Sequence, residues 1–265
     1  MIKKCFLITE FGSPFQWTQE YIDNVQKLGE FGWYWKIFTP NNYESKGNVE
    51  IIKMNTEEFD DLVERKTGIK SNVHLAGNGK PTVHMTDFYI FSGVIFEDYI
   101  KDMDFWGITN MDVVYGRLDH FITDDILKNC EIFTDDVNAI NGVFSLWKNT
   151  EKINNLFKRI PTWKLVLGQP ECRGCITGGD HSLYVSDEHQ MTEVLKMSPD
   201  ISYKYPTYYP MHSYDRLEQH QPKAKIEIKE DGALCELFND IKQPDFKYGR
   251  EIAYYHFNYT KTWPQ

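Results

Sequence analysis

The sequence lacks any long run of apolar residues. The run nearest the N-terminus, Cys5 to Ile8, is too short to form the core of a signal peptide. No other stretch approaches the roughly 20 consecutive apolar residues that a membrane-spanning helix needs. We therefore expect a cytoplasmic protein with no membrane span.

Cysteine is scarce and irregularly placed. The five cysteines are odd in number and loosely spaced, which does not fit a disulfide framework. A reducing compartment fits this usage better. Cys172 and Cys175 form a single CxxC pair with no second pair of ligands, so ordinary loop thiols are favoured over a structural zinc site.

Positive charge is also in short supply. The chain carries 29 Lys and Arg against 39 Asp and Glu, for a formal net charge of -10, and such a chain is a poor general binder of phosphate. Residues 148–164 are an exception, because they are rich in cations. The aromatic residues Trp147, Phe157 and Trp163 lie beside or between these cations. The cations are Lys148, Lys152, Lys158, Arg159 and Lys164. The simpler interpretation is a solvated helix face with core aromatics, and the alternative is a local groove for an anionic acceptor.

What the sequence does contain is enough apolar material for one α/β domain with a buried core: 41% of the 265 residues are apolar and 15% are aromatic. Strands are expected at residues 5–8, 33–38, 49–54, 105–109, 113–115, 142–147, 224–228 and 251–257. Helices are expected at 16–28, 56–66, about 87–99 and 180–185, the second of them capped by Asn55 or Thr56. This alternation predicts a parallel-rich central sheet with flanking helices.

The segment from Phe105 to Gly116 carries the most informative polar residues. An apolar strand over residues 105–109 is followed by Asn110 and Asp112. Ligands of an open parallel sheet bind beyond the carboxyl ends of its strands, and hard divalent cations take oxygen ligands that they share with phosphate. The pattern fits a metal–diphosphate site, but a turn with side-chain hydrogen bonds fits it as well.

Three blocks within residues 5–158 share motifs with a known family. The first is Ile8-Thr-Glu-Phe-Gly12 with Trp17 and Ile37-Phe-Thr39, similar to that family's "YFG" and "FTD" elements. The second runs from Thr86-Asp-Phe88 to Asp104-Phe-Trp-Gly107 and Met111-Asp-Val-Val-Tyr-Gly116, similar to "DFKPAYG" and "DFWGHCDIDVIFG". The third, Gly142-Val-Phe-Ser-Leu-Trp-Lys-Asn149, is similar to "GHFSLYKN". Together they resemble a little-characterised family of glycosyltransferase-like bacterial proteins near the GT-A transferases.

This resemblance implies a GT-A-like fold, a nucleotide-sugar donor and a divalent metal, Mn2+ or Mg2+. Asp112 matches the second acid of a DxD-type motif, whereas Asn110 stands where the family has the first acid. Tyr89 stands in place of a Lys and Val143 in place of a His. The residues implied in donor binding are Glu10, Phe11, Gly12, Asp87, Asn110, Met111 and Asp112, with Asp112 and Asn110 as metal ligands.

The C-terminus adds a second resemblance. Tyr255-His-Phe-Asn-Tyr-Thr-Lys-Thr-Trp-Pro264 resembles the "HF…KPW" ending of metal-dependent sugar transferases. It implies that His256 is a metal ligand and that Lys261 binds the donor diphosphate, which suits a neutral imidazole and an ammonium group. The alternative is a tail histidine packed beneath aromatic rings, with Lys261 in solvent.

Two aspartates are candidates for contact with the transferred sugar or the acceptor. Asp180 follows two glycines at an expected helix start, and Asp87 begins the second family block. Either residue can equally serve as a helix N-cap.

We interpret the chain as one GT-A-like domain over residues 1–265, with a donor-binding part at about 1–150 and an acceptor or closing part at about 151–265. The predicted reaction moves a sugar from a nucleoside diphosphate sugar to a hydroxyl, with metal assistance and a carbohydrate acceptor. One alternative acceptor is a hydroxylated base of modified phage DNA, which the basic segment suggests. Another alternative is a non-catalytic sugar-nucleotide or glycan-binding protein, which Asn110, Tyr89 and Val143 favour.

Overall fold

The computed structural model describes the backbone of residues 1–71, 73, 86–135, 140, 142–168, 187–205, 211–213, 225–239 and 247–256. Side chains at 86–87, 187–189, 211–213, 225, 236–239 and 247–250 lie outside this description. The helix predicted at 180–185 also lies outside the described part of the chain.

A mixed sheet of seven strands, in the order β3-β2-β1-β4-β7-β6-β8, forms the centre of the fold. Its strands are β1 (Lys4–Thr9), β2 (Trp33–Thr39), β3 (Val49–Lys53), β4 (Phe105–Thr109), β6 (Ile132–Thr134), β7 (Phe144–Lys148) and β8 (Tyr203–Lys204). Strand β7 is antiparallel to β4 and β6, and the other neighbouring pairs are parallel. The predicted α/β fold with a parallel-rich central sheet is confirmed.

Strand β1 shows why the sheet is buried on both faces. Cys5 and Leu7 belong to the core on one face, and Phe6 and Ile8 belong to the core on the other. Successive side chains of a strand point to opposite faces, so a continuous apolar run suits a central strand covered on both sides.

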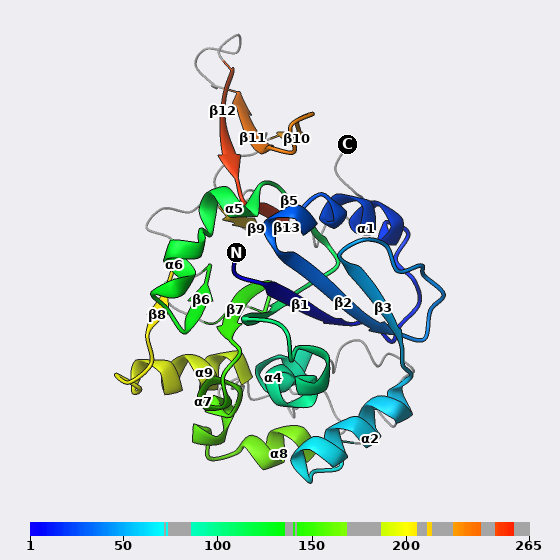
Figure 1. Ribbon diagram of the computed structural model, residues 1–265, viewed down its shortest axis with the longest axis vertical. Helices are drawn as coiled ribbons and strands as arrows, with labels where there is room; N and C mark the ends of the chain where they lie inside the picture. Colours follow the sequence, from blue (N-terminus) through cyan, green and yellow to red (C-terminus); the bar gives the residue numbers. More distant parts are fainter. Residues whose placement is uncertain are drawn as a thin grey trace, which may run out of the picture.

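Helices cover both faces of the sheet (Figure 1). Helices α2 (Thr56–Thr67), α4 (Ser92–Ile95), α7 (Glu151–Asn154), α8 (Trp163–Gly168) and α9 (Asp187–Lys196) contribute to the core that contains Leu7. Helices α1 (Thr18–Gln26), α5 (Leu118–Phe121) and α6 (Asp124–Lys128) contribute to the core that contains Phe6. Short 3-10 turns η1 (Gly29–Phe31) and η6 (Leu156–Arg159) join these elements. Within the described ranges, no helix is long and apolar enough to cross a bilayer.

Helix α2 begins at the cap that the sequence suggested. The side chain of Asn55 accepts a hydrogen bond from the Glu58 backbone N–H at 2.9 Å, and the Asn55 N–H donates to Glu58 Oε2 at 2.8 Å. This reciprocal capping box satisfies two amides that a helix start would otherwise leave without partners. Of the two predicted caps, Asn55 is therefore the one in use.

The single helix predicted at about 87–99 is wrong. The chain there forms the 3-10 turn η4 (Thr86–Phe91), then α4, then the 3-10 turn η5 (Glu97–Tyr99). Aromatic and β-branched residues dominate this segment, and they are modest helix formers. Gly93 also approaches the sheet so closely that a Cβ there would lie 2.6 Å from Nε1 of Trp106. Packing against β4 therefore shapes this segment more than helix propensity does.

Two small sheets complete the described fold. One has the order β5-β13-β9 and contains β5 (Val113–Tyr115), β13 (Tyr254–His256) and β9 (Met211–Ser213). The other is an antiparallel sheet of β10 (Lys225–Ile228), β11 (Leu234–Asn239) and β12 (Lys247–Ile252), which projects beyond the central sheet (Figure 1). The strand predicted at 251–257 is thus the end of β12 and the whole of β13, divided at Ala253.

Candidate functional site

A pocket lies at the carboxyl ends of β1 and β4. These strands are parallel neighbours, with Leu7 opposite Ile108, so the residues that follow each strand meet at one edge of the sheet. The pocket is lined by Ile8, Thr9, Glu10, Phe15, Tyr89, Thr109, Asn110, Met111 and Asp112. Its volume of about 170 Å³ is below the roughly 300–1,000 Å³ of ordinary ligand pockets, so the pocket has room for only a part of a ligand of that size.

His256 reaches Asp112 from the far end of the sequence. Strand β13 pairs with β5, and this register places His256 opposite Val113. Nε2 of His256 lies 3.1 Å from Oδ1 of Asp112, with the two side chains 8% and 21% exposed. Nε2 is buried and has no hydrogen-bond partner within the described residues, despite this proximity. A buried ring nitrogen beside a carboxylate oxygen, without a hydrogen bond between them, is an arrangement that a shared cation can satisfy.

The spacing of these two atoms fits a divalent cation. Two neighbouring ligands of an octahedral ion with bonds near 2.1 Å are about 3 Å apart. No group of three or more His, Cys, Asp and Glu side chains suited to a metal occurs among the described residues. Asp112 and His256 are thus two candidate ligands, one fewer than such a group needs, and substrate phosphates commonly complete the shell of an ion such as Mn2+ or Mg2+.

Asn110 is held by a neighbour from a different element. The Tyr89 hydroxyl, carried by η4, donates a hydrogen bond to Oδ1 of Asn110 at 2.8 Å. Both residues line the pocket. Because the amide oxygen is already engaged, Asn110 has only its second lone pair to offer as the metal ligand that the sequence suggested.

Glu10 lies in the pocket wall but is buried. Its carboxylate accepts hydrogen bonds from the hydroxyls of Thr39 and Tyr43 and from Nδ2 of Asn41, at 3.2 to 3.4 Å. Burial raises the pKa of Glu10, while these hydrogen bonds act in the opposite direction. The side chain therefore joins the segment after β2 to the pocket wall.

Met111 and Phe15 form the next part of the wall, and Trp17 contacts both of them. The Met111 carbonyl accepts a hydrogen bond from Trp17 Nε1 at 2.9 Å. Trp17 stacks on Phe15 with ring centroids 5.0 Å apart and an interplanar angle of 15°. Phe15 is 40% exposed and lines the pocket, although the sequence gave no reason to select it. An aromatic residue directly after Pro14, within the turn expected after the strand at 5–8, was the signal that the sequence contained.

Two of the predicted donor-binding residues do not line the pocket. The ring of Phe11 is buried in the core and packs against Phe59 at 5.5 Å. The carbonyl of Gly12 accepts a hydrogen bond from Nδ2 of Asn41 at 2.9 Å. Their roles in this structure are packing and turn formation, because the turn after β1 directs Phe11 toward α2 and presents Phe15 instead.

Several predicted site residues fall outside the description. Asp180, Lys261 and the Cys172–Cys175 pair are not among the described residues, and the same is true of the side chain of Asp87. Their assignments stay predictions.

A further carboxylate at this edge was missed. Strand β6 runs in the same direction as β4, because both are antiparallel to β7, so Asp135 follows β6 at the pocket edge of the sheet. The hydroxyl of Tyr254 donates to Oδ2 of Asp135. Tyr254 and His256 are two residues apart on β13 and so share one face of that strand. The pattern Ile132-Phe-Thr134-Asp135, an apolar strand followed by an acid, was the signal that could have found it.

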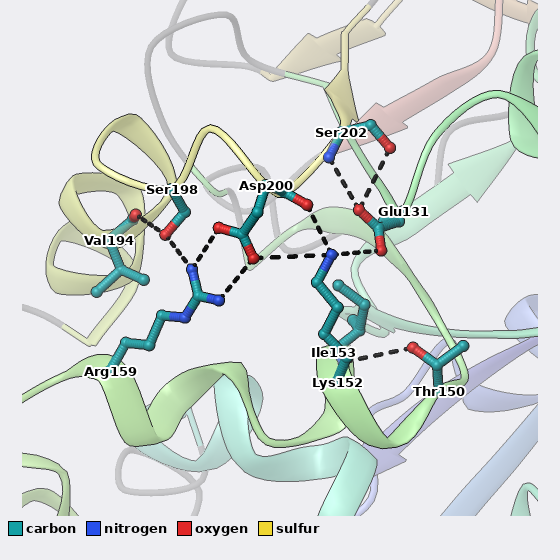
Figure 2. A network of polar contacts seen from close by, with 9 residues as sticks. All are labelled: Glu131, Thr150, Lys152, Ile153, Arg159, Val194, Ser198, Asp200 and Ser202. Carbon is teal, nitrogen blue, oxygen red and sulfur yellow. Dashed lines mark hydrogen bonds and ion pairs between the residues drawn. The ribbon is translucent and has the colours of Figure 1, made fainter.

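Two of the five cations of the basic segment, Lys152 and Arg159, form ion pairs in the folded chain. Figure 2 shows Arg159 binding both carboxylate oxygens of Asp200, while Lys152 binds Glu131 at 3.0 Å and the Asp200 backbone carbonyl at 2.6 Å. The Trp147 and Phe157 side chains are buried in the core. These contacts fit the simpler interpretation of the segment, a solvated face with core aromatics, better than a groove for an anionic acceptor.

A family model described as "Family of unknown function (DUF6625)" matches residues 9–263. No curated protein matches the chain. The sequence resemblance to a little-characterised family thus has its counterpart in DUF6625, whose description names no activity.

Solved structures with a similar chain path include three glycosyltransferases. One is involved in the glycosylation of the major capsid of PBCV-1, with 10% identity, a TM-score of 0.43 and coverage of 96% of this chain and 92% of that one. Core-mannan synthase A from Aspergillus fumigatus, in a Mn/GDP form, has 8% identity, a TM-score of 0.42 and coverage of 74% and 70%. Galactosyltransferase LgtC, in complex with donor and acceptor sugar analogs, has 10% identity, a TM-score of 0.46 and coverage of 96% and 86%. At such identities the matches concern the path of the chain and not its activity.

Proposed function

The chain belongs to DUF6625, a family of unknown function, and from the geometry of its own pocket we propose that it is a glycosyltransferase. The donor would be a nucleoside diphosphate sugar and the acceptor a hydroxyl group, by default on a carbohydrate. The observation that carries the proposal is the meeting of Asp112 and His256, with Nε2 and Oδ1 3.1 Å apart and Nε2 otherwise without a partner among the described residues.

Asp112 and His256 would hold Mn2+ or Mg2+ at the pocket, and Asn110 would act beside them. A bound ion of this kind supplies a Lewis acid for the leaving diphosphate. Phe15 offers an exposed ring of the kind on which a nucleobase stacks, and Glu10 fixes the segment that follows β2. Lys261 would add positive charge at the diphosphate.

In the proposed transfer, the bond between the sugar and the diphosphate oxygen breaks, and a bond to the acceptor oxygen forms. The acceptor hydroxyl loses its proton to a carboxylate, for which Asp87 and Asp180 are the candidates. Residues 1–150 would provide most of the donor site. The part beyond residue 150 would close it, since β13 brings His256 back to β5.

A thermal-shift screen of nucleotide sugars tests the donor class. A ligand that binds only the native state raises its stability, so the right donor should raise the melting temperature when Mn2+ is present and much less when it is chelated. Release of nucleoside diphosphate from that donor, with and without candidate acceptors, then reports turnover. A panel of UDP and GDP sugars that leaves the melting temperature unchanged in Mn2+ would contradict the proposal.

A non-catalytic binding protein is the competing class. It is favoured by the neutral Tyr89–Asn110 pair and by the presence of two, and not three, His or acidic ligands among the described residues. Such a protein would show the thermal shift but release no nucleoside diphosphate, either alone or with acceptors. Enzymatic release after a positive shift would exclude it.

A further inference from the structure

Tyr89 and Asn110 meet although they come from different elements. Tyr89 lies in η4, and Asn110 directly follows β4. The Tyr89 hydroxyl donates to Oδ1 of Asn110 at 2.8 Å, in the wall of the pocket that also contains Asp112. Two of the three positions at which the chain departs from the family pattern, Tyr89 in place of Lys and Asn110 in place of an acid, are therefore in direct contact.

This contact fixes which way the amide of Asn110 faces. An amide side chain has one acceptor oxygen and an NH2 group with two donors. With Oδ1 engaged by Tyr89, the NH2 group is the end that remains for a ligand. No described residue accepts a hydrogen bond from Nδ2 of Asn110, whose side chain is half-buried and lines the pocket.

The acidic lining of the pocket explains why an NH2 donor at Asn110 would favour binding of a diphosphate. Glu10 and Asp112 are the carboxylic acids that line it, and no Lys or Arg occurs among its described lining residues. A diphosphate that enters such a pocket needs hydrogen-bond donors as well as a cation, because two carboxylates alone would repel it. Asn110 supplies a neutral donor at the carboxyl end of β4, two residues before Asp112.

We propose that Asn110 binds the donor diphosphate through its NH2 group, and that Tyr89 is the positioning residue that holds the amide in this orientation. The inference rests on the proposed function and changes the assignment of one residue within it. The metal is left to Asp112 and His256, and Asn110 contacts a phosphate oxygen directly. In this chain the first position of the motif, Asn110, would contact phosphate. In the family an acid at this position would be a metal ligand.

The direction in which one substitution changes nucleoside diphosphate affinity separates a phosphate contact from a metal ligand at Asn110. Asn110→Asp replaces the NH2 donor by a second acceptor oxygen. The side chain keeps nearly the same shape but carries a negative charge. If Asn110 donates to phosphate, this change weakens binding of a nucleoside diphosphate. If Asn110 ligates the metal, the charged oxygen strengthens the ion's site and binding tightens.

Calorimetric titration with UDP and with GDP at saturating Mn2+ provides the measurement. We expect Asn110→Ala and Asn110→Asp to weaken binding by about tenfold or more, as for the loss of a hydrogen bond to a charged group. Tyr89→Phe keeps the ring and should weaken binding by about threefold to tenfold, since the amide is no longer oriented. In an Asn110→Ala background the same Tyr89→Phe change should have no further effect, because the residue it positions is gone.

Tyr99→Phe is the matched control, since Tyr99 packs against Phe38 and lies outside the pocket lining. Tighter binding by Asn110→Asp, or a loss from Tyr89→Phe that is equally large with and without Asn110, would overturn the inference while leaving the proposed function in place. If the wild-type protein binds neither nucleotide, the proposed function itself is wrong. Circular dichroism shows whether each variant is folded. If Asn110→Ala does not fold, the isosteric Asn110→Asp still provides the test.

Discussion

At the scale of single residues, the pocket holds two carboxylates in different surroundings. Asp112 is partly exposed and lies beside a histidine nitrogen. Glu10 is buried and accepts hydrogen bonds from three side chains. The sequence analysis predicted both acids as site residues, Glu10 from the family resemblance and Asp112 also from its place after the strand at 105–109. It could not tell that one faces a potential cation and the other faces only hydrogen-bond donors, because residues 39–43 and 256 are distant in sequence.

The burial of Glu10 gives a pH-dependent prediction. Burial raises the pKa of this carboxyl above its ordinary value of 4.5, so the folded state binds more protons than the unfolded state as the pH rises through that value. The contribution of Glu10 to the free energy of unfolding should therefore fall as the pH rises above about 4.5 toward neutrality.

Glu10→Gln removes this titrating group, so any remaining effect of the substitution on the free energy of unfolding does not depend on pH. Urea unfolding of both proteins between pH 4 and pH 7 should show the wild type losing stability relative to the variant as the pH rises. Tyr43, whose pKa is raised to about 12 chiefly by burial, does not titrate in this range. A stability difference that stays constant across the range would show that Glu10 titrates alike in the folded and unfolded states.

Phe15 provides a prediction with a closely matched control. Phe15 and Phe31 are 40% and 41% exposed, but only Phe15 lines the pocket. If its ring stacks on the nucleobase, Phe15→Ala should weaken nucleoside diphosphate binding by about 1–3 kcal/mol, and Phe31→Ala should leave it unchanged. Equal affinities for the two variants in a calorimetric titration would remove Phe15 from the site.

At the scale of elements, the sequence predicted the strands around the site better than the segments that cover them. Strands β1, β2, β3 and β4 were predicted within one or two residues, because each is an apolar run bounded by turn residues. Helices α5 and α6 and strand β11 were missed. The two helices have 4 and 5 residues, and a segment that short shows no clear periodicity. Their place depends on tertiary contacts that no local pattern contains.

Asn24 makes a tertiary contact that no local pattern predicts, between α1 and β5. Its side chain accepts from the Tyr115 N–H at 2.8 Å and donates to the Tyr115 carbonyl at 2.9 Å, so α1 supplies the edge of β5 with backbone-like hydrogen bonds. Asn24→Ala would leave two buried backbone groups without partners and should lower the free energy of unfolding by about 2–4 kcal/mol. Asn129→Ala, which removes an exposed hydrogen bond to the Asp125 carbonyl, should change it by about 0.5 kcal/mol or less. Similar denaturation midpoints for the two variants would contradict this role of Asn24.

At the scale of the whole molecule, the site depends on a segment near the C-terminus, β13, which pairs with β5. Strand β13 lies near the C-terminus, yet it pairs with β5 and places His256 beside Asp112. The sequence could suggest this meeting only through a resemblance of the C-terminal motif, since no local pattern predicts a strand pairing across so many residues. The described part of the second half of the chain thus supplies His256, which does not line the pocket but contacts Asp112, which does.

The most direct test of the central claim is nucleoside diphosphate binding by four proteins, each titrated with UDP and GDP in Mn2+ and in a chelator. These are the wild type, Asp112→Ala, His256→Ala and His120→Ala, the last a control because the His120 side chain is 47% exposed and lies near Glu251. We predict Mn2+-dependent binding by the wild type and by His120→Ala, no such binding by Asp112→Ala, and a loss of about tenfold or more for His256→Ala. Binding of equal strength by all four proteins, with or without Mn2+, would contradict the claim that Asp112 and His256 hold a metal on which the donor depends.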